Sequence, residues 1–252
     1  ETAGLLLSLG RVDEAESMLQ GALTSCGPGD ETQKGRLHAG LAGVYMETGR
    51  VKQADQQFVA AIEIHRAQAD RRYLGIALTN RAIHFRHTGQ GESPRRLLEE
   101  ALQIHREVGN KRFEGRTLLA LAGSHRTAEE HERAEQLYRE AQKLFESINA
   151  NFEAAQAWGN LANVYLTTNR MELAEEAYLR AYKVVREVGA QRSLGIVTGN
   201  LSSLYWSTGR LMLGLRVTRQ AIDTLERLGD RIISAAYRAQ LGARLTTLGY
   251  MR

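Results

Sequence analysis

The sequence predicts an all-α protein built as a stack of antiparallel helical hairpins, and three observations support this fold class. Ala, Leu, Glu, Arg and Gln dominate the 252 residues while only two prolines occur, and such side chains lose little rotamer freedom in a helix. Small residues recur with a period of 40 residues, and Gly or Asn recurs between them with the same period. Self-similarity at a fixed period indicates a repeat architecture.

Three columns of small residues share this period, and small residues let two helix backbones approach closely. The most regular column is alanine throughout and consists of Ala22, Ala61, Ala101, Ala141, Ala181 and Ala221. A column seven residues earlier consists of Ala15, Ala54, Pro94, Ala134, Ala174 and Gly214. The third column consists of Ala42, Ala82, Ala122, Ala162, Ser202 and Gly242.

Large residues fall between these columns in the same register, and we expect them to fill the space between hairpins. One column consists of Tyr45, Phe85, His125, Tyr165, Tyr205 and Leu245. Another consists of Phe58, Leu98, Tyr138, Tyr178 and Thr218. Each hairpin alone would leave an apolar face uncovered, so the stability must come from stacking on its neighbours.

Helix ends are predicted from Gly and Asn, which tolerate the left-handed conformation that ends a helix. Tight turns are placed at Gly10, Gly49, Gly89, Asn169 and Gly209, and short loops that close each unit at Gly109, Asn149, Gly189 and Gly229. The resulting elements are a partial repeat at 1–25, complete hairpins at 35–68, 75–108, 115–148, 155–188 and 195–228, and an unpaired helix at 233–252.

Two units depart from the pattern. Pro94 replaces a packing alanine and is expected in the first turn of its helix, with Ser93 as the N-cap. The unit at 115–148 has His125 and Glu129 where other units carry an aromatic residue and a glycine. We predict that this unit forms the least regular joint of the stack.

One repeat resembles the tetratricopeptide family at every defining position. The pattern is Ala/Leu-Ala-x-x-Tyr, then Gly, then Ala-x-x-x-Phe/Tyr-x-x-Ala, and its residues here are Trp158, Leu161, Ala162, Tyr165, Ala174, Tyr178 and Ala181. The resemblance covers essentially the whole chain. Its period exceeds the usual roughly 34 residues and is similar to the long repeats of LGN/Pins polarity proteins and of bacterial signalling regulators and kinases. The resemblance implies a right-handed superhelical solenoid, and the repeats cut at both ends suggest a fragment of a longer protein.

The motifs argue against catalysis and cofactors. A single cysteine, Cys26, excludes an internal disulfide and a structural zinc cluster and favours the cytoplasm. No apolar run approaches the roughly 18 residues that cross a bilayer, and neither a nucleophile elbow nor a phosphate loop occurs. We therefore expect a protein that is not an enzyme and holds no cofactor.

The histidines invite a metal interpretation that the spacing does not favour. His65 and His105 occupy one repeat position, which elsewhere holds Phe145, Val185 and Leu225, so packing is the preferred role. His84 and His87 share a helix face, but no cysteine or carboxylate cluster completes a metal shell around them. We expect no metal site.

Candidate ligand contacts lie on the face of each first helix that the packing columns leave free, which lines the concave groove in the tetratricopeptide family. One column of this face carries the amides Asn80, Asn160, Asn200 and Gln240, and Asn163 lies on the same face. A side-chain amide both donates and accepts, so a row of amides can pair with the backbone of an extended peptide. The alternatives are a solvated polar residue or a hydrogen bond between helices.

The same face is rich in arginine. It carries Arg36, Arg86, Arg116 and Arg126, and the loops between repeats add Arg72, Arg112 and Arg192. Guanidinium groups bind carboxylates in a bidentate way, and the only acid at the corresponding positions is Glu47. Apolar contacts are expected from Leu166, Trp206 and Met46. The net charge of +4 is spread along the chain, which favours an acidic partner over nucleic acid or a membrane.

Together these features predict a scaffold that binds an extended or partly helical, acidic peptide segment of another protein. The alternative is the sensor or regulatory segment of a larger bacterial transcription regulator or kinase, acting through ligand binding or through self-association at its open repeat ends. An enzyme would require an active site assembled across repeats.

Overall fold

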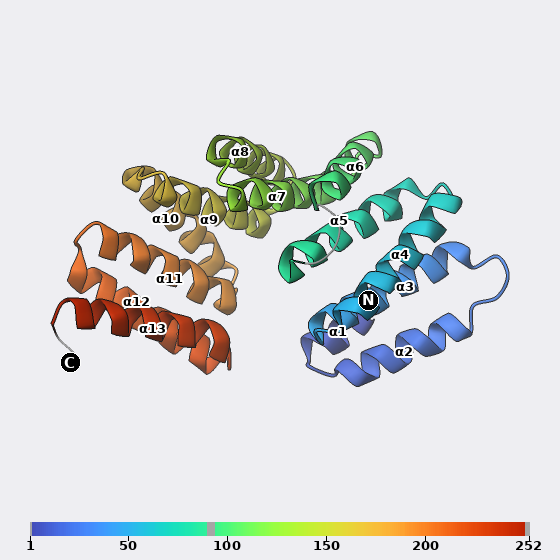
Figure 1. Cartoon of the computed structure of the whole chain (residues 1–252), viewed down its shortest axis with the longest axis horizontal. Coiled ribbons are helices and arrows are strands. Elements are labelled where there is room, and N and C mark those ends of the chain that lie inside the picture. The colour runs from blue at the N-terminus through green and yellow to red at the C-terminus, as the bar shows by residue number, and fades with distance from the viewer. Residues whose placement is uncertain (1, 90–93, 250–252) are drawn as a thin grey trace. The chain divides into compact units, whose positions relative to one another are not determined.

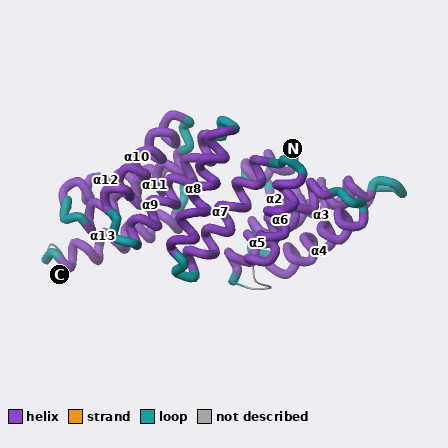
Figure 2. Tube along the Cα trace, turned by 90° about the horizontal axis from the view of Figure 1, so that it is seen from above, coloured by secondary structure: helices purple, strands orange, loops and turns teal. Residues whose placement is uncertain are grey.

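A computed structural model describes residues 2–89 and 94–249, and all regular structure in this part of the chain is helical (Figure 1). The helices are α1 (Thr2–Ser8), α2 (Val12–Thr24), α3 (Glu31–Glu47), α4 (Val51–Ala67), α5 (Arg71–Thr88), α6 (Pro94–Glu107), α7 (Lys111–Thr127), α8 (His131–Ser147), α9 (Asn151–Thr167), α10 (Met171–Glu187), α11 (Gln191–Ser207), α12 (Leu211–Arg227) and α13 (Arg231–Thr247). Outside residues 90–93, short loops join successive helices (Figure 2).

The chain divides into two compact units, residues 1–124 and 125–252, with the division inside α7. In the first unit α3 packs on α4 and α5 on α6, and α4 also contacts α5. In the second unit α9 packs on α10 and α11 on α12, and these pairs are joined through α10 and α11. The predicted fold class, an all-α stack of helical hairpins, is confirmed.

The first helix of each hairpin begins about one turn earlier than the residue range predicted from the sequence. The helix expected from residue 155 begins at Asn151, and the one expected from residue 195 begins at Gln191. Pro94 opens α6, as expected for a residue with no N–H to donate; Ser93, its predicted N-cap, lies outside the described residues.

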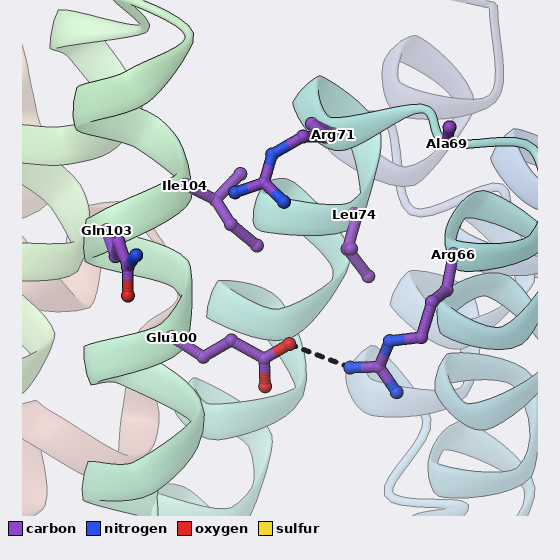
Figure 3. Close-up of a pocket in the computed structure, with 7 residues that line it drawn as sticks. All are labelled: Arg66, Ala69, Arg71, Leu74, Glu100, Gln103 and Ile104. Atoms are coloured by element: carbon purple, nitrogen blue, oxygen red, sulfur yellow. Dashed lines mark hydrogen bonds and ion pairs between the residues drawn. The ribbon is translucent and has the colours of Figure 1, made fainter.

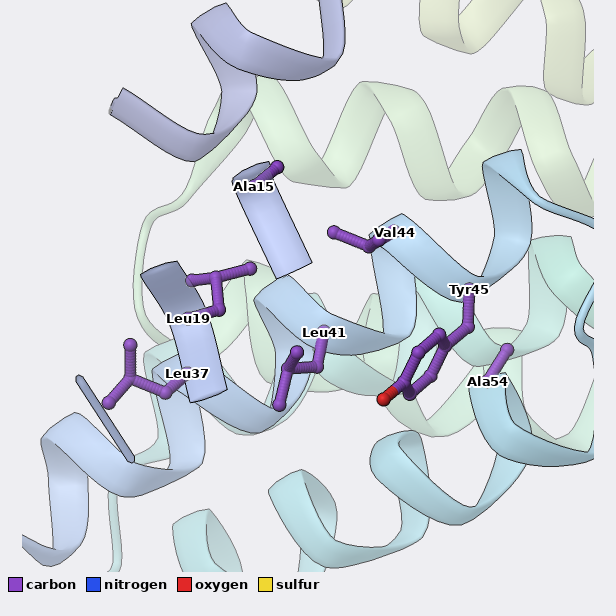
Figure 4. Close-up of a cluster of buried hydrophobic side chains, with 7 residues drawn as sticks. All are labelled: Ala15, Leu19, Leu37, Leu41, Val44, Tyr45 and Ala54. Atoms are coloured by element: carbon purple, nitrogen blue, oxygen red, sulfur yellow. The ribbon is translucent and has the colours of Figure 1, made fainter. Parts of the chain in front are cut away.

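The alanine column forms the centre of the hairpins, with one exception. Ala61, Ala101, Ala141, Ala181 and Ala221 have no exposed surface, whereas Ala22 is exposed. The prediction for Ala22 is wrong because α1 is only seven residues long and leaves the second half of α2 without a facing first helix. Burial in this region is instead provided by a cluster that joins α2, α3 and α4 (Figure 4), formed by Ala15, Leu19, Leu37, Leu41, Val44, Tyr45 and Ala54.

Two hairpins of the first unit also pair a glycine on the first helix with a histidine on the second. A Cβ atom on Gly35 would lie 2.7 Å from the His65 ring, and one on Gly75 would lie 2.8 Å from the His105 ring. His65 and His105 are 1% and 0% exposed. The structure therefore supports the packing role, since glycine leaves the space that each imidazole occupies.

An arginine that follows a tight turn links consecutive hairpins. In the second unit Arg170 donates from Nε to Thr168 Oγ1 (2.9 Å), lies 4.6 Å from the centre of the Tyr165 ring, and donates to Glu135 Oε2 (2.6 Å). Arg50 and Arg210 repeat this arrangement with the tyrosines and acids of their own joints. These stacked and paired guanidinium groups hold a loop against the preceding second helix.

The joint predicted to be irregular differs in side chains but not in its helix end. Glu129 adopts φ 61°, the conformation that glycine or asparagine adopts at the other tight turns. His125 and Glu130 stand where three other joints have tyrosine and arginine, and they contact each other directly through Nδ1 and Oε2. The division between the two units falls beside this pair.

Ala69 is strained by its turn, and we expect Ala69→Gly to stabilise the chain by about 1 kcal/mol. Ala69 has φ 52°, where the corresponding loops use Gly109, Asn149, Gly189 and Gly229, and an L-residue there costs roughly 1–2 kcal/mol. Urea unfolding followed by circular dichroism measures the change. Ala67→Gly, at the exposed end of α4, is the control and should lose up to about 1 kcal/mol. Equal stabilities of the two variants would contradict the strain.

Candidate functional site

The predicted amide column lies on the first helices, and two of its members have uncommitted side chains. Asn80 on α5 and Asn160 on α9 are half-buried, and neither side-chain amide hydrogen-bonds to a described residue. Gln240 on α13 is exposed. Amides at these three places are available to an external donor or acceptor.

Two other asparagines are engaged between helices. The Tyr237 hydroxyl of α13 contacts Asn200 Oδ1 at 3.3 Å and the Ile196 carbonyl oxygen at 3.2 Å. The Tyr178 hydroxyl of α10 donates to Asn163 Oδ1 at 2.6 Å. The alternative of a hydrogen bond between helices therefore applies to Asn163 and Asn200, each of which keeps its NH2 group for a ligand.

Most predicted arginines are exposed. They are Arg36, Arg72, Arg112, Arg116, Arg126 and Arg192. Arg36 lies 4.9 Å from the centre of the Tyr73 ring, and Arg116 lies 4.8 Å from that of Phe113. Stacking on a ring orders a guanidinium group while its edge still faces outward.

Arg86 and Arg192 bind oxygen atoms on neighbouring elements of the chain. Half-buried Arg86 on α5 donates from Nη1 to the Ala120 carbonyl oxygen on α7 at 3.2 Å. Arg192 on α11 donates to Asp230 Oδ2 at 2.8 Å. Asp230 lies outside the first-helix positions at which Glu47 is the only acid. These two guanidinium groups are already used to hold neighbouring helices or loops together.

The apolar candidates are only partly available. Leu166 and Met46 are half-buried, and Met46 packs against the cluster of α2, α3 and α4. Trp206 donates from Nε1 to Thr218 Oγ1 at 3.1 Å, and its ring lies where a Cβ atom on Gly214 would be 3.0 Å away. The indole N–H edge of Trp206 is thus engaged in the packing of α11 against α12.

A hollow of about 420 Å³ opens beside Trp206 in the second unit. Its walls are Ser203, Trp206, Ser207, Leu211, Ala243, Arg244, Thr247 and Leu248. The sequence reasoning missed Arg244, although the column that it occupies holds Val44, Val164 and Leu204 in three other helices. The same column also holds His84 and Ser124, so the signal that could have found Arg244 was a full charge in a column that is only partly apolar.

A second hollow, of about 390 Å³, lies in the first unit between α4, α5 and α6 (Figure 3). Leu74 and Ile104 line it, together with ionic side chains that pair with one another. Arg66 donates to Glu100 Oε1 at 2.7 Å, and Arg71 pairs with Glu107. Because these charges are matched within the chain, the hollow presents little unpaired charge to a ligand.

Within its described residues, the chain shows neither a group of metal-ligating side chains nor a helix suited to cross a bilayer. No group of three His, Cys, Asp or Glu side chains is placed there to hold a metal ion. His84 is buried and contacts the Val51 carbonyl oxygen through Nε2 at 3.2 Å. Among the described helices, none combines the length and apolar character that a bilayer crossing requires.

Comparison with known families matches two parts of the repeat array. The tetratricopeptide repeat family matches residues 73–147, and a second tetratricopeptide repeat match covers residues 155–184. Residues 73–147 and 155–184 are therefore tetratricopeptide repeats. The match at 155–184 contains the pattern from which the resemblance was predicted, and the recognition is confirmed.

Solved structures with the same fold extend the likeness over the whole repeat array. BtubC (BKLC) from P. vanneervenii is 17% identical over 87% of this chain and 90% of its own, with a TM-score of 0.71. A Rap protein complexed with Competence and Sporulation Factor is 16% identical over 100% and 75%, with a TM-score of 0.71. A STAND protein with a tetratricopeptide repeat sensor from Pyrococcus horikoshii is 20% identical, with a TM-score of 0.77. The chain spans 38% of that protein, which covers 99% of this tetratricopeptide array. No curated protein matches by sequence.

Proposed function

We propose that this tetratricopeptide array binds an extended, acidic peptide segment along the free faces of its first helices. The observation that carries the proposal is the pair Asn80 and Asn160, which occupy the same repeat position and make no hydrogen bond to a described residue. Asparagine is a poor helix former, so its return at one half-buried position is accounted for by a ligand. The proposed activity is binding and not catalysis.

Charge sets the chemistry of the segment. Arg36 and Arg116 are held over aromatic rings on the first helices of the first unit. Arg126 is exposed in the second unit. Guanidinium groups that are ordered in this way bind carboxylates with little further loss of side-chain entropy. The peptide is therefore expected to contain Asp or Glu, and its affinity to fall as the salt concentration rises.

A regulatory sensor is the second candidate function. It is favoured by the array of the Pyrococcus horikoshii protein, which is described as a sensor and covers almost all of this chain. The Rap protein complexed with Competence and Sporulation Factor has the same fold. In such a protein the same face would hold a signal while another segment gives the response.

Selection from a random 15-residue peptide library, followed by fluorescence polarisation, tests the binding proposal. Selected peptides should be enriched in Asp and Glu, and Asn160→Ala should weaken their binding by about tenfold, the cost of one or two lost hydrogen bonds. Asn151→Ala is the matched control, because Asn151 is exposed on the same helix but half a turn away around its axis.

Charge is tested separately with Arg116→Glu and Arg219→Glu. Both change the net charge equally, but Arg219 lies on α12, the second helix of its hairpin, where it is exposed. Only Arg116→Glu should lower the affinity for acidic peptides that bind the first unit. Equal effects of the two variants, or binding that does not change between low and physiological salt, would overturn the acidic-peptide proposal.

A further inference from the structure

Arg244 places a full charge where three other repeats place apolar side chains and two place His84 and Ser124. Val44, Val164 and Leu204 occupy the same column and have no exposed surface. Arg244 lies on α13, close to its end, and is half-buried. Burial lowers the pKa of its guanidinium group, which shows that the charge has lost part of its hydration. A partly desolvated charge is normally paired in a folded protein.

The described residues provide no acid for this charge. Arg244 makes no ion pair with any of them, and its hydrogen bond is a long one of 3.4 Å from Nη2 to Ser203 Oγ. By contrast, Arg238 on the same helix pairs with Glu226. The remaining N–H groups of Arg244 are therefore available, and they form a fork that fits a carboxylate.

The surroundings of Arg244 are shaped for an apolar group. Its guanidinium carbon lies 5.4 Å from the centre of the Trp206 ring, and both side chains line the hollow of about 420 Å³. Leu211, Ala243 and Leu248 form apolar walls. The hydrogen bond from Trp206 to Thr218 holds the indole in place. Hollows of this size and mixed lining are typical of small-ligand sites.

We propose that this hollow binds a carboxylate carried by an apolar group about as large as one aromatic side chain. The carboxylate pairs with Arg244, while the apolar group lies against Trp206, Leu211 and Leu248. Such a ligand removes the unpaired charge and the exposed apolar surface at the same time. The proposal goes beyond the peptide face, since it requires neither an extended backbone nor the amide column.

Titration with 4-phenylbutyrate, using 4-phenylbutanamide as the uncharged comparison, tests the site directly. The protein carries Trp158→Phe so that Trp206 is the only indole, and its fluorescence reports binding. Saturable binding of the acid is expected, with the amide at least roughly tenfold weaker, as for loss of a charge-assisted hydrogen bond. Equal affinities for acid and amide, or no saturable change, would overturn the proposal.

Variants of Arg244 and of Arg238 distinguish binding at this site from a general effect of net charge or of misfolding. Arg244→Gln should weaken acid binding by at least about tenfold, while Arg238→Gln, on the same helix, should leave it unchanged. Arg244→Lys keeps the charge but not the fork, and should bind with intermediate affinity. Helix content by circular dichroism confirms that each variant is folded. If all three variants bind the acid like the parent protein, Arg244 is not part of a ligand site.

A second titration, with peptides, shows whether the carboxylate belongs to a peptide chain end or to a free small acid. An acetylated tripeptide that ends in Phe is compared with its C-terminal amide, and binding of the free acid alone would assign the ligand to a chain end. If only 4-phenylbutyrate binds, the ligand is a free small acid. Asn160→Ala should alter neither titration, which distinguishes failure of this site from failure of the peptide face.

Discussion

Lowering the pH from 7.5 to 5 is expected to cost the folded chain about 2 kcal/mol through His105 alone. Its ring is 0% exposed, and burial lowers its pKa from 6.5 to about 4, against a smaller opposing contribution from the Gly75 backbone. Between these values the unfolded chain binds a proton that the folded chain does not. Stability is therefore complete above about pH 6.5 and is lost as the pH falls towards 4.

The measurement is the urea unfolding midpoint at both pH values, for the parent protein and for His105→Phe. Phenylalanine is the natural choice because Phe145 fills the same column with 0% exposed surface. Between the two pH values, the free energy of unfolding of the variant should change by about 2 kcal/mol less than that of the parent protein. The contributions of all other titrating groups are the same in both proteins and cancel in the comparison. Thr79 keeps its hydrogen bonds to the Gly75 carbonyl oxygen and to Thr117. An identical pH dependence in both proteins would show that His105 does not titrate as a buried neutral ring.

Gly195→Ala is expected to destabilise the α11–α12 hairpin by about 1–2 kcal/mol, although alanine favours a helix. A Cβ atom there would lie 2.7 Å from Leu225 Cγ and 2.9 Å from Cδ2, and overpacking typically costs about 1–3 kcal/mol. The matched control is Gly159→Ala on α9, where a Cβ atom would meet nothing within 4 Å. That variant should gain up to about 1 kcal/mol from helix propensity.

The chain itself indicates which second change should rescue Gly195→Ala. The corresponding pair in the preceding hairpin is Ala155 with Val185, which pack together with 1% and 2% exposed surface. Gly195→Ala combined with Leu225→Val reproduces that pair, so the double variant should be more stable than the sum of the two single changes implies. A coupling energy near zero in this double-mutant cycle would show that the two residues do not share one space.

Much of this fold is predictable because it depends on period and size. The 40-residue spacing of alanines placed Ala61, Ala101 and their equivalents at the helix contacts, where they are fully buried. Gly189, Gly209 and Asn169 marked the helix ends, and all have positive φ values. Such features are local, because a helix end or a close approach depends on one residue's conformational freedom or volume.

The site was only partly predictable, because a repeat position states which face a residue occupies and not what it touches. Asn80 and Asn163 are both asparagines on the predicted free face of a first helix, yet the Tyr178 hydroxyl hydrogen-bonds to Asn163 within its hairpin. Arg192 looked unopposed until the fold brought Asp230 to it. Arg244 was overlooked because its column is apolar in three of the five other helices, and only the hollow beside Trp206 revealed its position.

By itself, the sequence determined the hairpin repeat, its helix ends and the tetratricopeptide family, since these follow from spacings along the chain. Only the tertiary structure decided which polar side chains are already satisfied and which remain available to a ligand. Hydrogen bonds and ion pairs such as Tyr178–Asn163 and Arg192–Asp230 join residues 15 and 38 positions apart. Their formation depends on distances of a few ångströms that packing sets and that residue type alone does not.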